Sequence, residues 1–445
     1  MGRLFGTDGV RAVAGGDLSG ELAFQLGRAA VVALTELGER RPQITLGRDT
    51  RASGEFLEAA ISAGICSAGG DVLALGVATT PGVAFLTRDL GAQAGVVISA
   101  SHNPAEYNGI KFFAESGYKL PDGVEDEIER LVDSGEGPRP TGHGVGRIRP
   151  VTAAHERYLA HLADSAGGRL DGMRVVVDCA NGAASASGPD LLRRLGATVT
   201  PIHDQPDGWN INEECGATMP EVVARAVVEN EADAGVAFDG DADRAILADR
   251  EGGVIDGDQV LAACAVSMQR ASELPKSLVV TTVMANLGLR RALEDAGISL
   301  LETKVGDRYV LEEMLRSGAA LGGEQSGHVI FMEHATTGDG LLTSVRFLTM
   351  AASRGATVAE VAGIMRRYPQ VLQNVEVRDR GGLEANEEVR EAIRRAEAAL
   401  GGRGRVLVRA SGTEPLVRVM VEAQSEEEAG RHAGDISKVI EAALG

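Results

Sequence analysis

The chain has 445 residues and a net charge of −20, with 44% hydrophobic, 24% charged and only 3% aromatic residues. This balance is typical of a globular protein too long for one core, and the acidic charge and few aromatic residues argue against nucleic-acid and membrane-surface partners. No stretch approaches the ~20 apolar residues of a membrane span, the N-terminus has no apolar signal core, and the four cysteines form no CxxC pair. We therefore expect a reducing, cytoplasmic location.

Strand and helix signals alternate along most of the chain. An apolar stripe after Ser19 predicts a helix that ends at Gly38. Apolar, β-rich runs predict strands at Ile44–Gly47, Val72–Leu75, Val96–Ser99, Arg174–Asp178, Gly235–Asp239 and Leu278–Val283, and a helix follows the last of these at Leu289–Ala296. The recurring order of strand, small-residue turn and amphipathic helix predicts related α/β units with ligand sites at the carboxyl ends of the strands.

The division of the chain into domains follows from two changes in this pattern. A stretch rich in Gly, Pro and Arg at 134–150 predicts a boundary. After Pro369 the signals are a strand near Val375–Val377, a helix over Glu387–Leu400, strands at Arg405–Val408 and Leu416–Glu422, and a last helix. These predict a small α+β module. We expect four domains, at 1–150, 151–253, 254–368 and 369–445.

Three aspartates stand at alternate positions after a predicted strand, in the sequence DGDADR at 239–244. In extended backbone alternate side chains share a face, so Asp239, Asp241 and Asp243 can converge on one hard cation, and oxygen-only ligands favour Mg²⁺ over Zn²⁺. An EF-hand would need Gly and Glu where the chain has Arg244 and Arg250, and a phosphatase of the haloacid-dehalogenase type would carry Thr or Val in place of Asp243. A solvated acidic turn is the plain alternative.

The sequence ISASHNP at 98–104 predicts a strand that runs into a turn, with Ser101 at its tip and His102 beside it. Such residues are common in ordinary turns and do not by themselves indicate a nucleophile. No GxSxG sequence surrounds Ser101, so a Ser-His-Asp triad is not indicated. A phosphorylated Ser101 could instead supply an oxygen to the cation held by the aspartates, which would neutralise charge during phosphoryl transfer.

Two further loops carry polar side chains among small residues. In GEQSGH at 323–328, Glu324 and Ser326 have the spacing that reaches neighbouring sugar hydroxyls from extended backbone. His328 is a candidate acid or base, although a lone histidine is more often structural. RASGTEPLVR at 409–418 joins two predicted strands, and its guanidinium, hydroxyl and amide groups could cradle a phosphate.

The four motifs occur in this order, one in each predicted domain, and together they resemble the α-D-phosphohexomutase superfamily from Gly6 to Arg418. Stretches similar to the bacterial phosphoglucosamine mutase family are FGTDGVR at 5–11, SASHNP at 99–104, NGIKFF at 108–113, VGDRY at 305–309 and Gln325 within GEQSGH. One departure is Ala12, where the family usually has Gly. A positive φ at this position would strain an alanine.

The resemblance implies an α/β fold with four domains around a central cleft: three related layered domains and a smaller C-terminal α+β domain. It implies an isomerase that interconverts glucosamine 6-phosphate and glucosamine 1-phosphate through phosphorylated Ser101 and a 1,6-bisphosphate, and so supplies amino-sugar nucleotide and cell-wall precursor synthesis. Ser101, Asp239, Asp241 and Asp243 would hold Mg²⁺. Ser101, Lys111, Arg11 and His328 are the catalytic candidates. The substrate-binding candidates are Arg244, Glu324, Ser326, Arg409, Ser411, Gly412, Thr413 and Arg418.

Two other functions are compatible with these motifs. One is a mutase of the same superfamily that acts on glucose or mannose phosphates, which details of the sugar loop would distinguish. The other is a non-catalytic regulator that binds sugar phosphates, which would be expected to have lost Ser101 or an aspartate. The sequence leaves the oligomeric state open, and a homodimer is the assembly considered.

Overall fold

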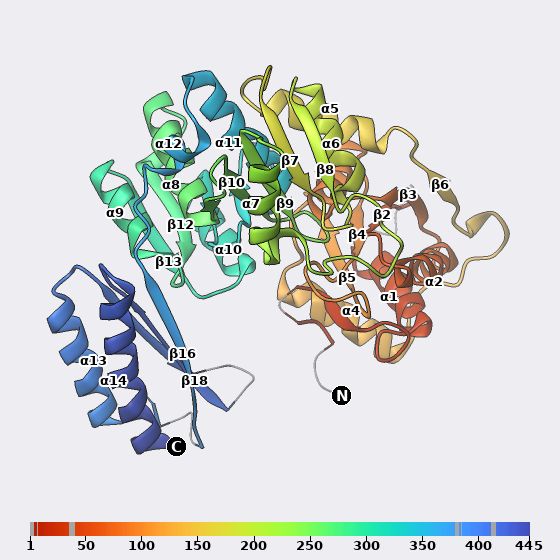
Figure 1. Cartoon of the computed structure of the whole chain (residues 1–445). Helices are drawn as coiled ribbons and strands as arrows, with labels where there is room; N and C mark the ends of the chain where they lie inside the picture. The colour runs from red at the N-terminus through yellow and green to blue at the C-terminus, as the bar shows by residue number, and fades with distance from the viewer. Residues whose placement is uncertain (1–3, 7, 35–40, 379–381, 384, 411–414) are drawn as a thin grey trace. The chain divides into compact units, whose positions relative to one another are not determined.

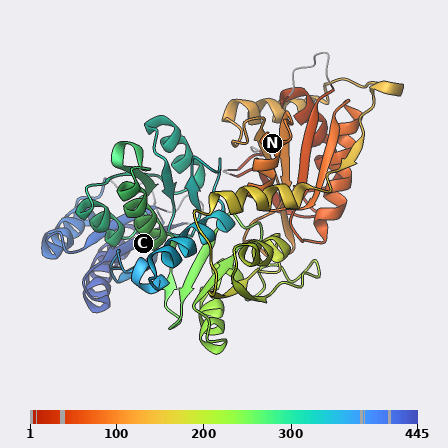
Figure 2. The ribbon, with the colours of Figure 1, turned by 90° about the horizontal axis from the view of Figure 1, so that it is seen from above.

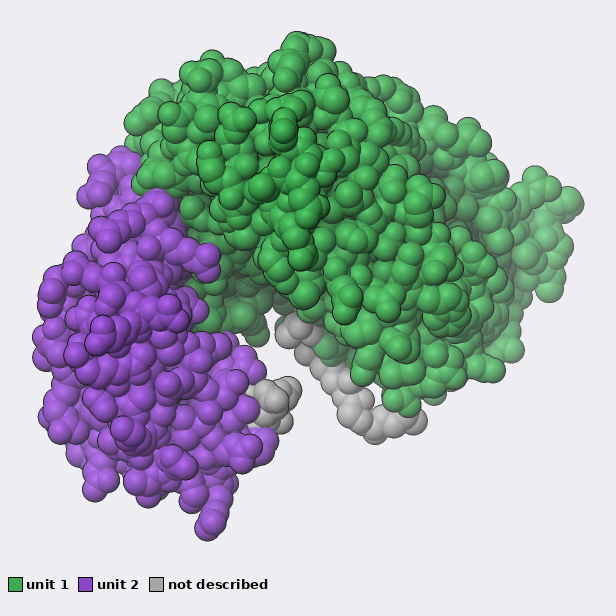
Figure 3. Space-filling view, viewed as in Figure 1, with its two compact units in different colours: residues 1–284, 297–364 green, residues 285–296, 365–445 purple. Residues whose placement is uncertain are grey.

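The computed structural model describes residues 4–6, 8–34, 41–378, 382–383, 385–410 and 415–445. The chain divides into two compact units, which Figure 3 shows in different colours. Unit 1 comprises residues 1–284 and 297–364, and unit 2 comprises residues 285–296 and 365–445. None of the described helices has both the length and the apolar character needed to cross a membrane.

The first sheet of unit 1 has the strand order β1-β5-β4-β2-β3-β6 in the described chain. Strands β2, β3 and β4 are parallel to one another, β6 joins β3 in parallel, and β5 lies antiparallel between β4 and β1. The strands are β1 (Val10–Val13), β2 (Gln43–Arg48), β3 (Asp71–Val77), β4 (Ala94–Ile98), β5 (Tyr107–Ala114) and β6 (Ile148–Pro150). The helices are α1 (Gly20–Leu34), α2 (Ser53–Ser67), α3 (Thr80–Asp89) and α4 (Asp122–Ser134), with a 3₁₀ turn at Gly142–Gly144.

Helices cover both faces of this sheet, as Figure 2 shows. The alternation of side chains along β4 explains why: Val96 and Ile98 pack into a core with α1, α2 and α4, whereas Val97 packs with Val83 of α3 on the other face. A strand buried on both faces is apolar at every position, as β4 is. Its carboxyl end leads directly into the loop that carries Ser101.

The second and third sheets of unit 1 also combine parallel strands with antiparallel pairing at one edge. The second has the order β11-β10-β9-β7-β8, and the third β13-β12-β14-β15. Their strands are β7 (Arg174–Asp178), β8 (Thr198–Ile202), β9 (Ala234–Phe238), β10 (Ala245–Asp249), β11 (Val254–Ile255), β12 (Leu278–Thr282), β13 (Ser299–Thr303), β14 (Leu321–Gly323) and β15 (Val329–Phe331). Their helices are α5 (Ala154–Ser165), α6 (Ala184–Arg194), α7 (Pro220–Glu229), α8 (Gly257–Ala271), α10 (Asp307–Ser317), α11 (Gly340–Arg354) and α12 (Val358–Ala362), with 3₁₀ turns at Gly216–Thr218 and Pro275–Ser277.

Unit 2 is an antiparallel sheet of order β16-β18-β17 with helices on one face (Figure 1). Its elements are β16 (Gln370–Glu376), α13 (Glu387–Leu400), β17 (Arg405–Ala410), β18 (Leu416–Glu422) and α14 (Glu426–Leu444). A helix from earlier in the chain, α9 (Leu287–Asp295), belongs to this unit as well. The carboxylate of Glu422, which is fully buried, accepts hydrogen bonds from Asn286 Nδ2 (3.1 Å) and the backbone N–H of Leu287 (3.0 Å).

The predicted α/β class is confirmed, and the predicted strands and helices are present with ends shifted by a few residues. Ser19 caps α1 as expected, because its Oγ accepts the N–H of Leu22 at 3.2 Å; the predicted end at Gly38 lies outside the described residues. The stretch 134–150 contains β6, so its last residues belong to the first sheet. Ala12 lies in the extended strand β1 opposite Asn108, so the strain considered for it does not arise. The four domain boundaries stay a prediction.

Candidate active site

The loop after β4 places Ser101 in the interior of unit 1, not at an exposed tip. The side chain is 1% exposed, and its φ of 51° lies in the left-handed region that few non-glycine residues adopt. Its Oγ–H donates to Asp239 Oδ2 at 2.7 Å, and His102 Nδ1 lies 3.3 Å from the same Oγ. Burial, together with the charges of Arg244 and Arg11, lowers the pKa of His102 to about 4, so this imidazole is neutral at pH 7. The nucleophile candidate therefore meets the predicted metal loop directly.

The three aspartates converge, but not for the reason that the sequence suggested. Residues 240–243 form turns and bends, with Ala242 at φ 56°, instead of the extended backbone that was expected. The turn brings one carboxylate oxygen of each of Asp239, Asp241 and Asp243 within 4.8 Å of the others. All three side chains are buried. The three carboxylates do lie close together, but the extended geometry from which this was predicted was wrong.

The three aspartates of this cluster differ in how their surroundings shift their pKa values. Burial and the neighbouring aspartates raise the pKa of Asp239 and of Asp243 above the ordinary range. Asp241 is also buried, but the adjacent Lys111 ammonium and a hydrogen bond from Thr80 lower its pKa. Asp241 Oδ1 and Asp243 Oδ1 are buried without a hydrogen-bond partner among the described residues. Converging carboxylates with unused oxygens fit a hard divalent cation, which would offset their mutual repulsion.

Two of the predicted cations lie beside the cluster. The Nζ of Lys111, on β5, is 2.8 Å from Asp241 Oδ2 and 2.9 Å from Asp8 Oδ2. Burial disfavours the charge of Lys111, but these two carboxylates outweigh it and raise its pKa above the ordinary value. Arg11, on β1, donates from Nη2 to Asp8 Oδ2 at 2.5 Å. The pairing of β1 with β5 thus brings both cations to one edge of the sheet.

Arg244 and His328 are the next candidates of unit 1. Arg244 directs Nε to within 3.7 Å of Asp243 Oδ1, and its backbone N–H donates to Asp239 Oδ1 at 3.3 Å. His328 is 2% exposed, and its Nε2 accepts the N–H of Gly338 at 3.2 Å. This hydrogen bond is one that a histidine with a structural role would make. The same Nε2 lies 3.6 Å from Asp307 Oδ2.

The GEQSGH loop connects β14 to β15 as a tight turn, not as extended backbone. The N–H of Gly327 donates to the carbonyl of Glu324 at 3.0 Å, and Gly327 has a φ of 92°. Glu324 and Ser326 are half-buried. Glu324 Oε1 accepts the N–H of Gly306 at 3.1 Å, so this loop contacts the VGDRY motif at 305–309. The Oγ of Ser326 has no hydrogen-bond partner among the described residues.

The predicted phosphate cradle is in unit 2. Arg409 and Arg418 face each other across the β17–β18 ladder, near the strand ends that flank residues 411–414. Burial and the charge of Arg418 lower the pKa of Arg409, as expected for two like charges held opposite each other. Such a pair is stabilised by an anion. Ser411, Gly412 and Thr413 lie outside the described residues.

Sequence reasoning missed several residues that organise the site. Thr80, at the start of α3, donates its hydroxyl to Asp241 Oδ2 at 2.6 Å. Asp8 accepts from Lys119 Nζ at 2.6 Å, and Lys119 also pairs with Asp307 of α10. These partners are separated by more than a hundred residues in the chain, so no local pattern indicates the pairs. The position of these residues relative to the predicted strands and helices was the available sequence signal. Polar residues at the ends of parallel strands and at helix starts gather at one edge of a sheet.

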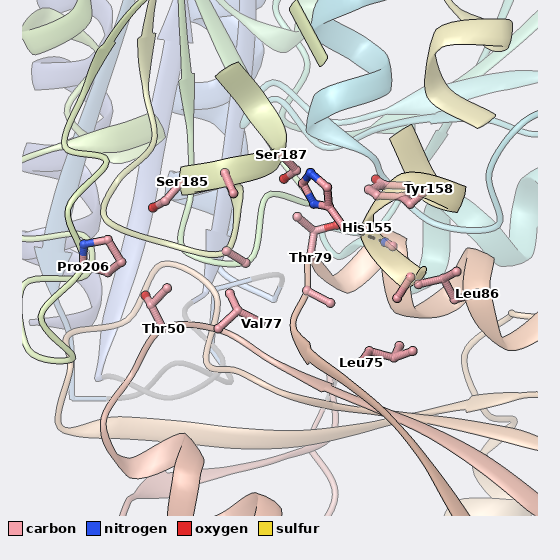
Figure 4. Close-up of a pocket in the computed structure, with 15 residues that line it drawn as sticks. Thr50, Leu75, Val77, Thr79, Leu86, His155, Tyr158, Ser185, Ser187 and Pro206 are labelled. Atoms are coloured by element: carbon pink, nitrogen blue, oxygen red, sulfur yellow. Dashed lines mark hydrogen bonds between the residues drawn. The ribbon is translucent and has the colours of Figure 1, made fainter. Parts of the chain in front are cut away.

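A cavity of about 270 Å³ lies next to the site but not in it (Figure 4). Leu75, Val77, Leu86 and Pro206 contribute apolar surface, and Tyr158 closes one side. The three aspartates and Ser101 are not among its lining residues. The reaction centre is therefore identified by its charges and hydrogen bonds and not by the volume of a cavity.

Comparison with known proteins agrees with this geometry. Family models described as phosphoglucomutase/phosphomannomutase domains I, II and III and C-terminal domain match residues 2–138, 156–253, 256–368 and 372–439. A phosphoglucosamine mutase of Moorella thermoacetica is 56% identical over 430 residues, which is 96% of this chain and 97% of that protein. Another, of Symbiobacterium thermophilum, is 55% identical over 447 residues and covers 100% of both chains. The chain belongs to the phosphoglucosamine mutases.

Solved structures show that this family fold extends over the whole chain. A phosphoglucomutase/phosphomannomutase family protein of Burkholderia thailandensis matches with a TM-score of 0.82 at 24% identity, covering 100% of this chain and 98% of that chain. An N-acetylphosphoglucosamine mutase of Aspergillus fumigatus, solved with GlcNAc-6P and magnesium, matches with a TM-score of 0.67 at 19% identity and covers 99% and 96% of the two chains. At these identities the likeness concerns the fold. The predicted resemblance to the phosphohexomutase superfamily is confirmed by the family models and curated relatives.

Proposed function

We propose that this protein interconverts glucosamine 6-phosphate and glucosamine 1-phosphate, with Ser101 as the phosphoryl carrier. The observation that carries the proposal is the contact between Ser101 Oγ and Asp239, one of three buried carboxylates that can share a cation. A phosphoryl group on Oγ would stand beside that cation. Glucosamine phosphate is the substrate on which the names of the curated relatives agree.

Mg²⁺ is the cation that this donor set fits best. Asp239, Asp241 and Asp243 offer carboxylate oxygens only, and Cys or His ligands of the kind that favour Zn²⁺ are not part of the cluster. The unpartnered Oδ1 atoms of Asp241 and Asp243 are available as ligands, and Lys111 takes the other oxygen of Asp241. When bound, the cation would neutralise negative charge that develops on the transferring phosphoryl group.

The reaction is a pair of phosphoryl transfers in opposite directions. In the first, the 1-hydroxyl of glucosamine 6-phosphate attacks the phosphorus on Ser101; the bond from phosphorus to Oγ breaks, and in the net reaction the proton of the hydroxyl passes to Oγ. The resulting 1,6-bisphosphate turns over in the site. Ser101 Oγ then attacks the 6-phosphoryl group; the bond from phosphorus to the sugar O6 breaks, the Oγ proton passes in the net reaction to O6, and glucosamine 1-phosphate is released. In this second step the Oγ proton has two acceptors in reach, Asp239 Oδ2 at 2.7 Å and His102 Nδ1 at 3.3 Å.

Electrostatic stabilisation is the role that we assign to Lys111 and Arg11. The raised pKa of Lys111 keeps it cationic, so it is a poor proton acceptor but a fixed positive charge beside Asp241. A preorganised charge of this kind stabilises a transition state without reorganisation. His328 is the weaker catalytic candidate, since its Nε2 already accepts a backbone N–H.

Substrate recognition is assigned to the remaining groups. Glu324 and Ser326 would bind sugar hydroxyls, and Arg244 would bind a phosphate near the aspartates. Arg409 and Arg418, with Ser411, Gly412 and Thr413, would bind the phosphate that does not react. Two positive charges that face each other across the strands support this assignment, because an anion between them would relieve their repulsion. Binding energy from a remote phosphate can position the reacting end of the substrate.

A panel of hexose 6-phosphates tests the proposed substrate. The phosphate and the 3-hydroxyl are shared by glucosamine, glucose and mannose phosphates, so discrimination must come from carbon 2, where these sugars carry an equatorial amine, an equatorial hydroxyl and an axial hydroxyl. A mismatch that leaves one polar group unpaired costs on the order of 1–3 kcal/mol. We expect kcat/KM for glucosamine 6-phosphate to exceed that for glucose 6-phosphate by tens- to hundreds-fold, with mannose 6-phosphate poorer still. Equal or better use of glucose or mannose phosphate in competition kinetics would reassign the substrate.

A further inference from the structure

The backbone of the Ser101 loop needs an external restraint. A left-handed φ of 51° at a residue other than Gly, Asn or Asp is unfavourable, and such conformations persist only where surrounding structure holds them. Phosphorylation adds nearly two negative charges to the same residue, beside three aspartates. The loop must therefore keep one geometry in two very different charge states.

Arg51, which follows β2, supplies a restraint from one side of the loop. It is 0% exposed, and its guanidinium donates to three carbonyls of the nucleophile loop. Nη2 donates to the carbonyls of Ser101 at 3.0 Å and Asn103 at 2.8 Å, and Nη1 donates to the carbonyl of Pro104. A planar guanidinium has donors in a fixed fork, so these contacts fix the direction of the loop as well as its distance.

Asp49 extends the restraint to the other side of Ser101. Its Oδ2 accepts Arg51 Nε–H at 2.9 Å and the Ser99 hydroxyl at 2.6 Å, and its Oδ1 accepts the N–H of Arg51 at 3.0 Å. Ser99 Oγ in turn accepts the backbone N–H of Ser101 at 3.0 Å. The Asp49–Arg51 pair therefore reaches both the N–H and the carbonyl of Ser101. Asn212 Nδ2 donates to the Ser101 carbonyl as well, at 2.9 Å.

We propose that Arg51 and Asp49 are positioning residues for phosphoryl transfer, which hold Ser101 Oγ at one place while it gives up and recovers the phosphoryl group. The inference rests on the proposed function. A buried ion pair is a poor source of stability compared with apolar packing, so the direction of its donors is informative. Here three of the contacts made by the guanidinium go to the nucleophile loop. Neither residue touches the reacting atoms.

Variants of Arg51 test the proposal, with Arg48, the last residue of β2, as a control arginine nearby in the chain. The Arg48 side chain pairs with Glu58 at 2.9 Å and donates to the backbone carbonyl of Asp49 at 3.2 Å, but among the described residues it makes no hydrogen bond to the Ser101 loop or to the Asp49 carboxylate. In Arg51→Lys we expect kcat to fall by about 10²-fold, the effect of a misplacement of about 1 Å, with KM for glucosamine 6-phosphate changed less than about threefold. Arg51→Met should be slower still, and Arg48→Lys should keep wild-type turnover.

A second measurement separates positioning from folding and from substrate choice. Unphosphorylated enzyme is mixed with glucosamine 1,6-bisphosphate, and phosphorylation of Ser101 is followed by intact mass in a single turnover. The rate in Arg51→Lys should fall by the same factor as kcat, while Mg²⁺ affinity and the thermal midpoint stay near those of Arg48→Lys. Unchanged phosphorylation of Ser101, or a loss of kcat fully accounted for by unfolded protein or weaker Mg²⁺ binding, would overturn the proposal.

Ser99→Ala keeps the inference testable if the Arg51 variants do not fold. This change removes the link from Asp49 to the Ser101 N–H but leaves the ion pair intact. We expect a fall of about tenfold in kcat and in the Ser101 phosphorylation rate, at unchanged KM, and wild-type rates would contradict the restraint. Wild-type enzyme that phosphorylates Ser101 but does not turn over glucosamine 6-phosphate would contradict the proposed substrate and not the role of Arg51.

Discussion

The proposed reaction centre around Ser101 and the aspartates and the proposed sugar loop (GEQSGH, 323–328), both in unit 1, are built in opposite ways. Around Ser101 and the aspartates the side chains are buried and are bonded to one another. In the GEQSGH loop, Glu324 and Ser326 are half-buried and make few contacts through their side chains. The two regions nevertheless adjoin, since the N–H of Ala245 donates to the carbonyl of Gly327 at 3.1 Å.

This difference follows from what each region must do. Phosphoryl transfer depends on charges that are held in fixed positions. Burying a charge costs desolvation energy, and contacts with partner groups must offset that cost. A loop that binds a sugar which turns over between two steps must instead offer polar groups that several orientations can use. Substitutions in the reaction centre should therefore change kcat, and substitutions in the sugar loop should mainly change KM.

The largest effect is expected for the nucleophile. Ser101→Ala removes the phosphoryl acceptor, and turnover should fall by on the order of 10⁴-fold or more, because loss of a covalent nucleophile removes a whole pathway. The fold should persist, since one hydroxyl contact to Asp239 is lost. Steady-state assays and intact mass check both points, with Ser185→Ala as a control serine outside the centre. Full activity in Ser101→Ala would exclude the mechanism.

Removal of the cation should have the next largest effect. A chelator should abolish turnover and added Mg²⁺ should restore it, because the aspartates otherwise repel one another. Asp241→Asn should raise the Mg²⁺ concentration needed for half-maximal activity by roughly 10²-fold and lower kcat, since both a ligand and the partner of Lys111 are changed. Turnover by demetallated enzyme would show that the cluster is structural.

The sugar loop should respond differently and more weakly. Glu324→Gln keeps the shape of the side chain but removes its charge, and a hydrogen bond to a charged group contributes about 1.5–3 kcal/mol. We expect KM for glucosamine 6-phosphate to rise by roughly ten- to a hundredfold with a smaller change in kcat. A loss confined to kcat would place Glu324 in the chemistry and remove the contrast between the two regions.

The smallest expected effect concerns a buried carboxylate outside both regions. Burial raises the pKa of Asp339 to about 6, although it accepts hydrogen bonds from Leu342 N–H (2.9 Å) and Tyr158 (2.7 Å). The folded protein then binds more protons than the unfolded chain between about pH 4 and 6, so this residue lowers stability as pH rises through that window, by roughly 3 kcal/mol at most. Asp339→Asn should flatten this slope in thermal midpoints measured from pH 4.5 to 7. An unchanged slope would exclude the raised pKa.

The sequence predicted the reaction centre better than it predicted the reasons for it. The strands are visible because buried strands are apolar throughout, and Ser101 and the aspartates stand directly after two of them. The turn that makes the aspartates converge was not predicted. Alternate side chains of an extended backbone also share a face, so the spacing of the three aspartates does not distinguish a turn from a strand. Arg51 was missed because an arginine after a strand is normally solvated, and only the packed structure shows it to be buried.

The packing of α9 with unit 2 has a consequence for how the chain folds. The three strands of the C-terminal sheet all come from residues after 365, but its buried Glu422 accepts hydrogen bonds from Asn286 and Leu287, which lie more than a hundred residues earlier. Closing so long a loop is slow relative to local pairing. The C-terminal module is thus discontinuous in sequence. In a fragment that starts at Pro369, the buried Glu422 carboxylate would lack its hydrogen bonds from Asn286 and Leu287. An autonomous version would need α9 joined to it, for instance by circular permutation.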